Sequence, residues 1–184
     1  MKFIIHGGTL SRSLQSISSV VPSGRTMPIL LNFLMEVENE ELKITASDLE
    51  TTITVKLNPS MLEQDQVNKI AIPAKMFLEV VNSLSSQQIT VEVKENYSVE
   101  ITAGTGRYKL VGEDPASYPT AIELSDPALT TISSSVLVKA IGKTLFATGT
   151  GEMRPQMTGV LCEQTHNETI FVATDAHKLV KCTS

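Results

Sequence analysis

Apolar residues recur along this chain with two periods, and the two periods follow one another in a regular order. Between positions 9 and 20, three of them fall on one face of a helix: Leu10, Leu14 and Ile17. Between positions 51 and 57, three others alternate with threonine and lysine, the period of a half-buried strand: Ile53, Val55 and Leu57. The pattern predicts short strands alternating with helices of a few turns.

The same criteria place elements along the whole chain. Helices are expected at 9–20, 73–84 and 135–148, the first capped by Gly8 or Thr9 and the second opened by Pro73. A hairpin turn is expected at 38–40, and a polar, proline-marked loop at 58–68. Strands are expected at 2–5, 31–38, 42–47, 51–57, 69–72, 88–93, 98–103, 107–111, 130–132, 157–164, 169–174 and 178–183.

One stretch of the sequence occurs twice in the chain, in similar form. The run PILLNFLMEVENEELKITASDLE from Pro28 is echoed by PQMTGVLCEQTHNETIFVATDAH from Pro155, at an offset of about 127 positions and without a gap. At the same offset, Leu10 and Leu14 fall on Leu137 and Ile141. Spacing kept over such a length predicts one fold used twice.

The second copy covers only the front part of the first. Ser184 falls near the position of Leu57, so we expect one complete domain at 1–120, a linker at 121–128 and the first half of a second domain at 129–184. Each module reads as two strand-helix-strand-strand-strand halves. A lone half-module exposes a sheet edge and an apolar face, so we expect it to pair with a second copy, to be partly disordered, or to be completed by a missing portion of the chain.

Composition favours a soluble, cytoplasmic protein without a cofactor. The chain has 184 residues, 41% of them hydrophobic, and a formal net charge of −5. No apolar run is long enough to span a membrane, and the opening MKFIIHGG is too short to be a signal peptide. The negative charge argues against a surface that grips nucleic acid everywhere.

Residues that could carry chemistry are sparse. Cys162 and Cys182 lack metal-type spacing and are expected to be buried free thiols. The three histidines are scattered, so no metal site is expected. Asp48 and Asp175 recur at equivalent places, and we interpret them as turn residues that accept bonds from neighbouring amides. The glycine pairs Gly104–Gly106 and Gly149–Gly151 are interpreted as a hairpin turn and as the C-terminal stop of a helix. No active site is predicted.

Several strings resemble the beta sliding clamp family of bacterial DNA polymerase III. They are MKF at the start, GRTMPIL at 24–30, LKITASDLE at 42–50, IPAKMFLEVV at 72–81, SYP at 117–119, RPQMTGVL at 154–161 and VATDAHKL at 172–179. The strings stand in the family's order over nearly the whole chain. The resemblance implies an α+β DNA clamp fold, with helices packed on antiparallel sheets.

The resemblance also implies a function. Members are non-enzymatic processivity factors, homodimeric rings of three domains per chain that encircle duplex DNA without sequence preference. They tether DNA polymerase III, the clamp loader and other proteins that carry a clamp-binding motif, and they involve no membrane. A sliding ring needs few phosphate contacts, which fits sparse cations on an acidic chain.

Three sets of site residues follow from the resemblance. The family's DNA-contacting positions match Arg25, Arg154, Arg12, Lys139 and Lys143, although Pro155 and Gln156 stand where some members carry aromatic residues. The partner-peptide pocket matches Met157, Thr174, Ala176, His177, Lys178 and Leu179. The ring interface matches Met76, Val80, Leu84, Tyr108 and Leu110.

The residues leave alternatives open at two points. Met157 and Leu179 could be ordinary sheet core rather than the floor of a groove. The chain as a whole could instead be a small enzyme or ligand-binding domain with a similar two-layer fold, or a clamp-like regulator that acts as a protein-interaction module. Binding of a peptide with the pattern Gln-Leu-x-Leu-Phe separates a clamp from the first of these.

Overall fold

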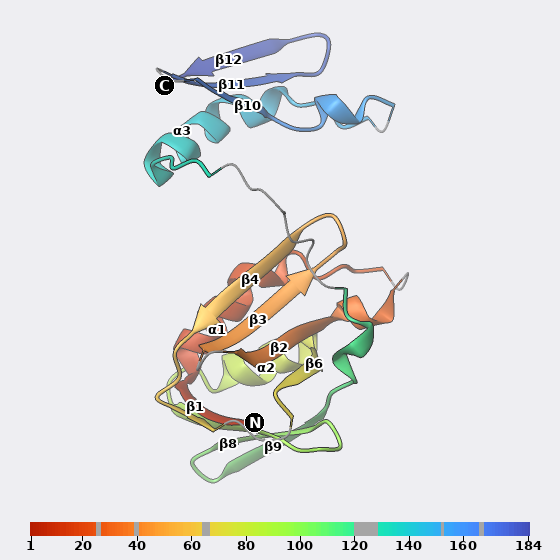
Figure 1. Ribbon diagram of the computed structural model, residues 1–184, viewed down its shortest axis with the longest axis vertical. Coiled ribbons are helices and arrows are strands. Elements are labelled where there is room, and N and C mark those ends of the chain that lie inside the picture. Colours follow the sequence, from red (N-terminus) through yellow and green to blue (C-terminus); the bar gives the residue numbers. More distant parts are fainter. Residues whose placement is uncertain (25–26, 39–40, 64–66, 120–128, 152, 166–167) are drawn as a thin grey trace. The chain divides into compact units, whose positions relative to one another are not determined.

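The chain forms two compact units, Met1–Glu123 and Leu124–Ser184, which we call unit 1 and unit 2. The computed structural model describes residues 1–184 except 25–26, 39–40, 64–66, 120–128, 152 and 166–167 (Figure 1). The predicted hairpin turn at 38–40 therefore lies partly outside the described residues. Each unit is described by itself.

Unit 1 consists of two halves with the same order of elements. The first half contains β1 (Lys2–His6), α1 (Gly7–Ser18), the 3-10 helix η1 (Pro28–Leu31), β2 (Asn32–Glu38), β3 (Glu41–Ser47) and β4 (Thr52–Leu57). The second half contains β6 (Lys69–Pro73), α2 (Ala74–Ser83), β7 (Gln88–Val93), β8 (Ser98–Ala103) and β9 (Gly106–Val111). A short strand, β5 (Met61–Glu63), stands between them, within the segment that the sequence predicts as a loop.

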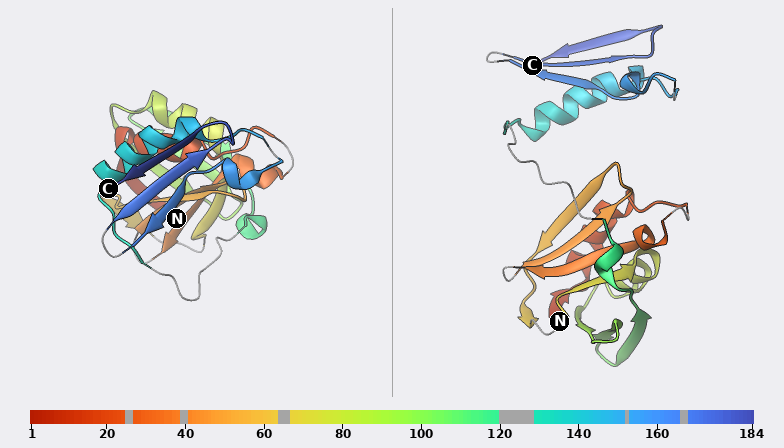
Figure 2. Two further views of the ribbon diagram at one scale, coloured as in Figure 1. Left: turned by 90° about the horizontal axis from the view of Figure 1, so that it is seen from above. Right: turned by 45° about the vertical axis from the view of Figure 1, so that its right-hand side comes forward.

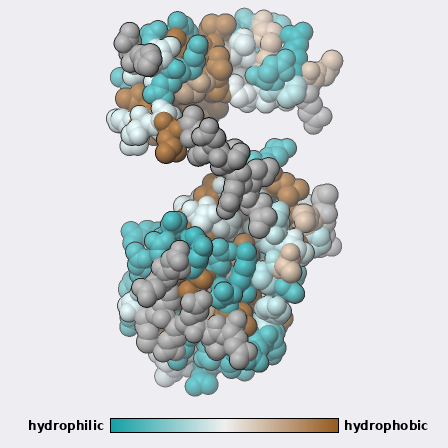
Figure 3. Space-filling view, in the orientation of Figure 1, coloured by the Kyte–Doolittle hydropathy of each residue, from teal (hydrophilic) through white to brown (hydrophobic). Residues whose placement is uncertain are grey.

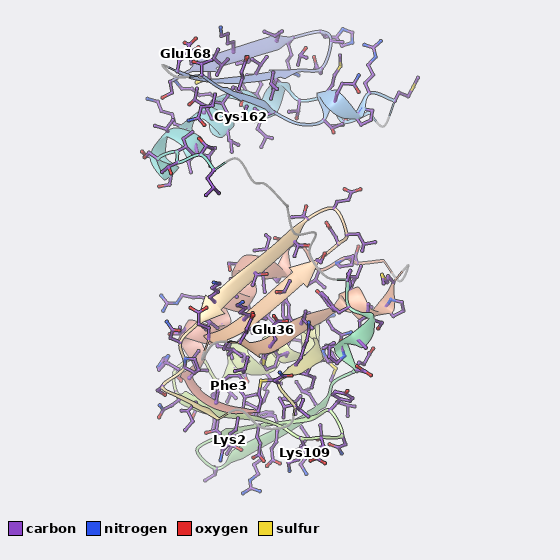
Figure 4. The ribbon with its side chains drawn as sticks, viewed as in Figure 1. Lys2, Phe3, Glu36, Lys109, Cys162 and Glu168 are labelled. Atoms are coloured by element: carbon purple, nitrogen blue, oxygen red, sulfur yellow. The ribbon has the colours of Figure 1, made fainter. Side chains whose placement is uncertain are left out.

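The two halves exchange their first strands. One antiparallel sheet has the order β5-β1-β7-β8-β9 and the other β4-β3-β2-β6, so β1 lies in the sheet of the second half and β6 in that of the first. Phe3 stands opposite Val91, and Met35 stands opposite Ile70. All four side chains are buried, and Phe3 lies inside the unit (Figure 4).

Both helices lie on the same side of the four-stranded sheet and contact each other (Figure 1). The core joins apolar residues of both halves, among them Leu10, Leu14, Phe77 and Val81, which are fully buried. Between the helices, the Ser11 hydroxyl donates to the Asn82 side-chain oxygen at 2.5 Å, and Gln15 Nε2 donates to the same oxygen at 3.0 Å. The fold of unit 1 therefore depends on contacts between its halves.

The start of α1 differs from the prediction. The helix begins at Gly7, and the cap is His6, whose Nδ1 accepts a hydrogen bond from the Gly8 amide at 3.2 Å. A side chain on Gly7 would meet the carbonyl oxygen of Leu84 at 2.2 Å, so only glycine fits where α1 approaches the end of α2. The Gly7 amide donates to the Gln87 carbonyl at 2.9 Å, which fixes this approach.

Unit 2 repeats the first half of unit 1. It contains α3 (Ser134–Thr144), the 3-10 helices η3 (Leu145–Ala147) and η4 (Pro155–Met157), and the strands β10 (Leu161–Gln164), β11 (Thr169–Thr174) and β12 (Leu179–Thr183). The strands form an antiparallel sheet in the order β10-β11-β12, and α3 lies across one of its faces (Figures 1 and 2). The α+β class expected from the sequence, with helices packed on antiparallel sheets, is confirmed.

Three expectations for unit 2 are wrong. Residues 130–132 form no strand, and the Thr130 hydroxyl bonds instead to the side chain of Gln164 on β10. Residues 157–160 are not part of a strand, since the proline-led 3-10 helix η4 precedes β10, as η1 precedes β2. Cys162 is an exposed free thiol rather than a buried one, and Cys182 is half-buried.

Replacing Gly7 with alanine tests the close approach of the two helices. The added methyl group forces the Leu84 carbonyl to move, and Gly7→Ala should lower the free energy of unfolding by about 1–3 kcal/mol. Urea denaturation measures the change. Gly151→Ala is the matched control, since nothing lies within 4 Å of its added methyl group. Equal effects of the two substitutions would contradict the steric explanation.

Candidate functional site

A turn between β11 and β12 presents several of the predicted site residues. One carboxylate oxygen of Asp175 accepts hydrogen bonds from the amides of His177 at 3.0 Å and Lys178 at 2.9 Å. Its other oxygen lies 2.7 Å from the Lys178 ammonium. The Lys178 side chain first, and the two amides after it, hold the pKa of Asp175 well below its ordinary value. The turn is therefore built around an ionised carboxylate.

Thr174 and Ala176 complete this turn. The Thr174 hydroxyl accepts from the Ala176 amide at 3.1 Å and donates to the Lys178 carbonyl at 2.8 Å. Ala176 has a φ of 74°, a left-handed conformation that glycine adopts more easily than alanine. These bonds compensate for the strain and position His177 and Lys178.

Unit 1 contains the same turn. Asp48 accepts from the amides of Glu50 at 3.0 Å and Thr51 at 2.6 Å, and Leu49 between them has a φ of 80°. The interpretation of Asp48 and Asp175 as turn residues is confirmed. The exposed side chains differ between the copies, because Leu49 and Glu50 stand where unit 2 carries Ala176 and His177.

The turn of unit 2 borders an open pocket of about 920 Å³. Four predicted peptide-site residues line it: Met157, Ala176, His177 and Lys178. Met157 reaches it from η4, whose position is fixed by a hydrogen bond of 2.8 Å from the Gly149 amide to the Met157 carbonyl. The pocket is large enough for apolar side chains of a short peptide.

The remaining two peptide-site candidates lie outside the pocket lining. Thr174 acts through the turn, and Leu179 stands on β12 with 66% of its surface exposed, so Leu179 is not sheet core. Other residues that the sequence analysis did not assign to the peptide site also line the pocket, among them Phe146, Met153 and Arg154. Phe146 and Met153 are exposed apolar residues on either side of the Gly149-Thr150-Gly151 segment. This glycine pair is the sequence signal that could have indicated a loop at the pocket.

The predicted DNA-contacting cations lie on helices and on one loop. Arg12 lies on α1, Lys139 and Lys143 lie on α3, and all three are exposed. Within the described parts of the chain, none of the three forms an ion pair with an acidic side chain. Arg154 precedes η4 at the rim of the pocket, and Arg25 lies outside the described residues.

The candidates for the ring interface separate into exposed and buried residues. Met76 on α2 is 54% exposed and Tyr108 on β9 is 37% exposed. Leu84 and Leu110 are buried in the core of unit 1, because the second half packs α2 and β9 against the first, so they cannot be part of a free surface. Val80 is half-buried, and Val111, which the sequence analysis did not single out, is 74% exposed.

The described part of the chain contains no group of histidine, cysteine and acidic residues that could hold a metal ion. None of its helices is long and apolar enough to cross a membrane.

Family models match both units in the order that the fold requires. The DNA polymerase III beta subunit N-terminal domain matches residues 1–122, and the central domain of the same subunit matches residues 131–184. The chain belongs to the DNA polymerase III beta subunit family.

Individual members of this family agree with the assignment. Beta sliding clamps of Staphylococcus aureus and Staphylococcus epidermidis are 29% and 28% identical to the chain over 184 residues. In both cases the match covers 97% of this chain and 49% of the relative. The chain thus spans about half the length of these curated relatives.

Solved structures of the family confirm the clamp fold that was expected from the sequence. The DNA polymerase III subunit beta of Pseudomonas aeruginosa has a TM-score of 0.90 at 29% identity, covering 100% of this chain and 50% of that one. The sliding clamp of Bacillus subtilis has a TM-score of 0.89 at 28% identity, with the same coverage. A second Pseudomonas aeruginosa structure, with a TM-score of 0.91 at 29% identity, shows that clamp bound to griselimycin and covers 100% of this chain and 49% of that one.

Removing the Asp175 carboxylate tests how the candidate pocket is organised. Asp175→Ala leaves the amides of His177 and Lys178 without their acceptor, so their hydrogen exchange should accelerate and the left-handed residue should lose its support. Because its pKa is lowered from 3.8, the wild-type carboxylate should hold the turn at all pH values above 3.8 and release it as the pH falls further. Asp48→Ala is the matched control, which should accelerate exchange only in unit 1. NMR-detected exchange checks both variants, and unchanged amides in Asp175→Ala would contradict this role.

Proposed function

We propose that the chain carries the DNA-tracking and partner-binding parts of a sliding clamp, a processivity factor that encircles duplex DNA and tethers polymerase to it. The observation that supports this most is the match of two consecutive clamp domains to a chain whose second unit repeats the first half of unit 1. The proposed role is non-enzymatic and cytoplasmic. It requires surfaces for DNA, for partner peptides and for a second subunit.

The DNA surface consists of few cations on an acidic protein. Arg12, Lys139 and Lys143 project from helices without acidic partners in the described chain, and Arg154 stands at a loop. The net charge of −5 repels phosphate over the remaining surface. Duplex DNA would then contact a small number of charges without sequence preference, which allows sliding.

The partner surface is the pocket beside the Asp175 turn. Met157, Phe146 and Met153 supply apolar area, while His177 and Lys178 supply polar groups at the rim. This composition suits the apolar clamp-binding motif of DNA polymerase III, the clamp loader and other clamp partners. Lys178 is already paired with Asp175, so His177 is the freer polar group for a peptide.

The subunit surface of the proposed homodimeric ring lies on the second half of unit 1. Met76, Val80 and Tyr108 remain as candidates, and Val111 is an exposed apolar residue on the other face of β9. β9 is the last strand of its sheet, so its outer edge offers unpaired backbone groups to another strand. An edge strand with exposed apolar residues is suited to pairing with a second chain.

Weak, salt-sensitive binding to linear duplex DNA tests the DNA surface. Without an encircling ring, the 184-residue chain should bind with a shallow salt slope that corresponds to roughly two to four phosphates. Arg154→Glu should weaken this binding, whereas Lys109→Glu, which reverses an exposed charge on β9, should not. Fluorescence anisotropy at several salt concentrations measures both. Tight or sequence-specific binding at physiological salt would contradict a sliding function.

A labelled peptide of the pattern Gln-Leu-x-Leu-Phe tests the partner pocket. Binding should be weak but measurable, and Met157→Lys should reduce the affinity by about tenfold or more, because a charge replaces part of the apolar floor. Leu49→Lys is the matched control, since Leu49 is an exposed apolar residue of the equivalent turn in unit 1. Isothermal calorimetry measures both. If Leu49→Lys weakened binding as much as Met157→Lys, the pocket would be misplaced.

A further inference from the structure

Unit 1 contains a pocket of about 540 Å³ that is separate from the surfaces proposed for DNA, peptides and a second subunit. It lies between the end of α1, the segment 19–31 that follows it, the beginning of β2 and the first turns of α2. None of the residues that line it belongs to the three sets of site residues considered above. Both halves of unit 1 contribute to this unit 1 pocket.

The pocket arises from a difference between the two halves. Residues 19–31 connect α1 to β2 in the first half, whereas residues 84–87 are sufficient to connect α2 to β7 in the second. The longer connection contributes Val21, Pro22 and Leu31 to the pocket wall. The second half shows that the fold closes without such a wall, so the pocket is not a requirement of the repeated architecture.

Apolar side chains form the interior of the pocket. Phe33 and Ala74 are buried, with 0% and 3% of their surfaces exposed, while Val21, Leu31 and Leu78 are half-buried. Leu31 is not among the residues that pack against the two apolar clusters described for unit 1. By contrast, the face of unit 1 seen in Figure 3 is mostly hydrophilic, with hydrophobic residues scattered over it.

One positive charge stands at this apolar interior. Lys75, in the first turn of α2, is the one charged residue among the described residues that line the pocket, and it is exposed. Within the described chain, its ammonium forms no ion pair with an acidic side chain. The Ser18 hydroxyl, also in the lining, donates to the Gln15 carbonyl at 2.9 Å. The pocket therefore favours an apolar ligand with a negative charge at one end.

The elements around the pocket favour a small molecule over an extended peptide. β2, which carries Phe33, is paired on both sides, with β3 and with β6, so it offers no free strand edge. The helices α1 and α2 use their backbone groups for their own hydrogen bonds. An extended peptide would bury its amides against side chains without partners, which is costly. A hydrocarbon chain has no such groups to satisfy.

We propose that the unit 1 pocket binds a small carboxylic acid with an unbranched apolar chain of roughly eight carbons, a size that suits a pocket of this volume. The chain lies against Phe33, Leu31 and Leu78, and the carboxylate lies beside the Lys75 ammonium. Such a ligand contacts both halves of unit 1 and the segment 19–31, so it stabilises unit 1. The site involves unit 1 alone and does not depend on the proposed clamp function.

A titration with octanoate, followed by NMR of the amides of the 184-residue chain, tests the proposal. The amides of Val21, Leu31 and Leu78 should shift together and saturate, with a dissociation constant of about 1 mM or below. Octan-1-ol has the same chain without the charge, and it should bind to the same residues about three- to fivefold more weakly, the range expected for an ion pair at an exposed site.

Replacing Lys75 with glutamine tests the role of the charge. Lys75→Gln should weaken the binding of octanoate to the level of octan-1-ol and should leave the binding of octan-1-ol unchanged, because only the carboxylate interacts with the ammonium. Lys109→Gln is the matched control, since Lys109 is another exposed lysine of unit 1 and lies outside the pocket lining. It should alter neither affinity.

A charge on the pocket wall tests the location of the chain. Leu31→Glu should reduce the affinity for octanoate at least tenfold, because it places a carboxylate against the apolar chain and repels the ligand's own carboxylate. Leu49→Glu is the matched control, an exposed leucine of unit 1 away from the pocket, and should leave the affinity unchanged. Circular dichroism should show that both variants keep their secondary structure.

Three results would overturn the proposal. One is an octanoate titration in which the pocket amides do not shift, or in which shifts are spread over both units without saturation. Another is a Lys75→Gln variant that weakens octanoate and octan-1-ol equally or affects neither, which would exclude the pairing of Lys75 with the carboxylate. The third is tighter binding of the tripeptide Ala-Leu-Leu than of octanoate, which would show that the pocket accepts a peptide C-terminus in preference to a free acid.

Discussion

The exchange of first strands between half-modules is the constraint on which the rest of this structure depends. β1 completes the sheet of the second half and β6 completes that of the first, so neither half of unit 1 has all its hydrogen-bonding partners within its own sequence. The buried pairs Phe3–Val91 and Met35–Ile70 lie on these exchanged strands. Burial of the core and pairing of the backbone therefore occur together.

The functional surfaces depend on this constraint to different degrees. The turn built on Asp175 is local, since its hydrogen bonds run only between Thr174 and Lys178, and it forms within one half-module. The pocket beside it therefore needs no second half. The strand positions are the opposite case, since Leu34 and Met35 of β2 are buried beside β6 of the second half, whereas their equivalents in unit 2, Leu161 and Cys162, are exposed.

The sequence predicted the strands and turns whose conformation depends only on neighbouring residues. Period-two alternation identified β4, whose residues Ile53, Val55 and Leu57 turn inward, and the recurrence of Asp48 and Asp175 identified the two turns. The glycine pair at Gly104 and Gly106 marked the turn between β8 and β9. In each case the residue type and its own neighbours are sufficient to favour the observed conformation.

Features that depend on residues far away in the sequence were not predicted correctly. Residues 130–132 carry strand-type residues but form no strand in the described chain. The sequence alone could not show whether apolar Leu84 and Leu110 face a partner or the core. Cys162 occupies a core position of the repeated fold, yet nothing in the described chain covers it. The peptide pocket was predicted in part, because Phe146 and Met153 enter it from a neighbouring loop rather than from the turn that carries the family's strings.

Native-state hydrogen exchange on unit 1 tests most directly whether reciprocal exchange makes its two halves one structure. The amides of β1 and β6 should exchange with the same free energy as those of β3 and β8, and at the value of global unfolding, because no half can open without breaking the sheet of the other. If the strands of one half exchanged at a clearly lower free energy while those of the other remained protected, the halves would be independent, and this explanation of the fold would be wrong.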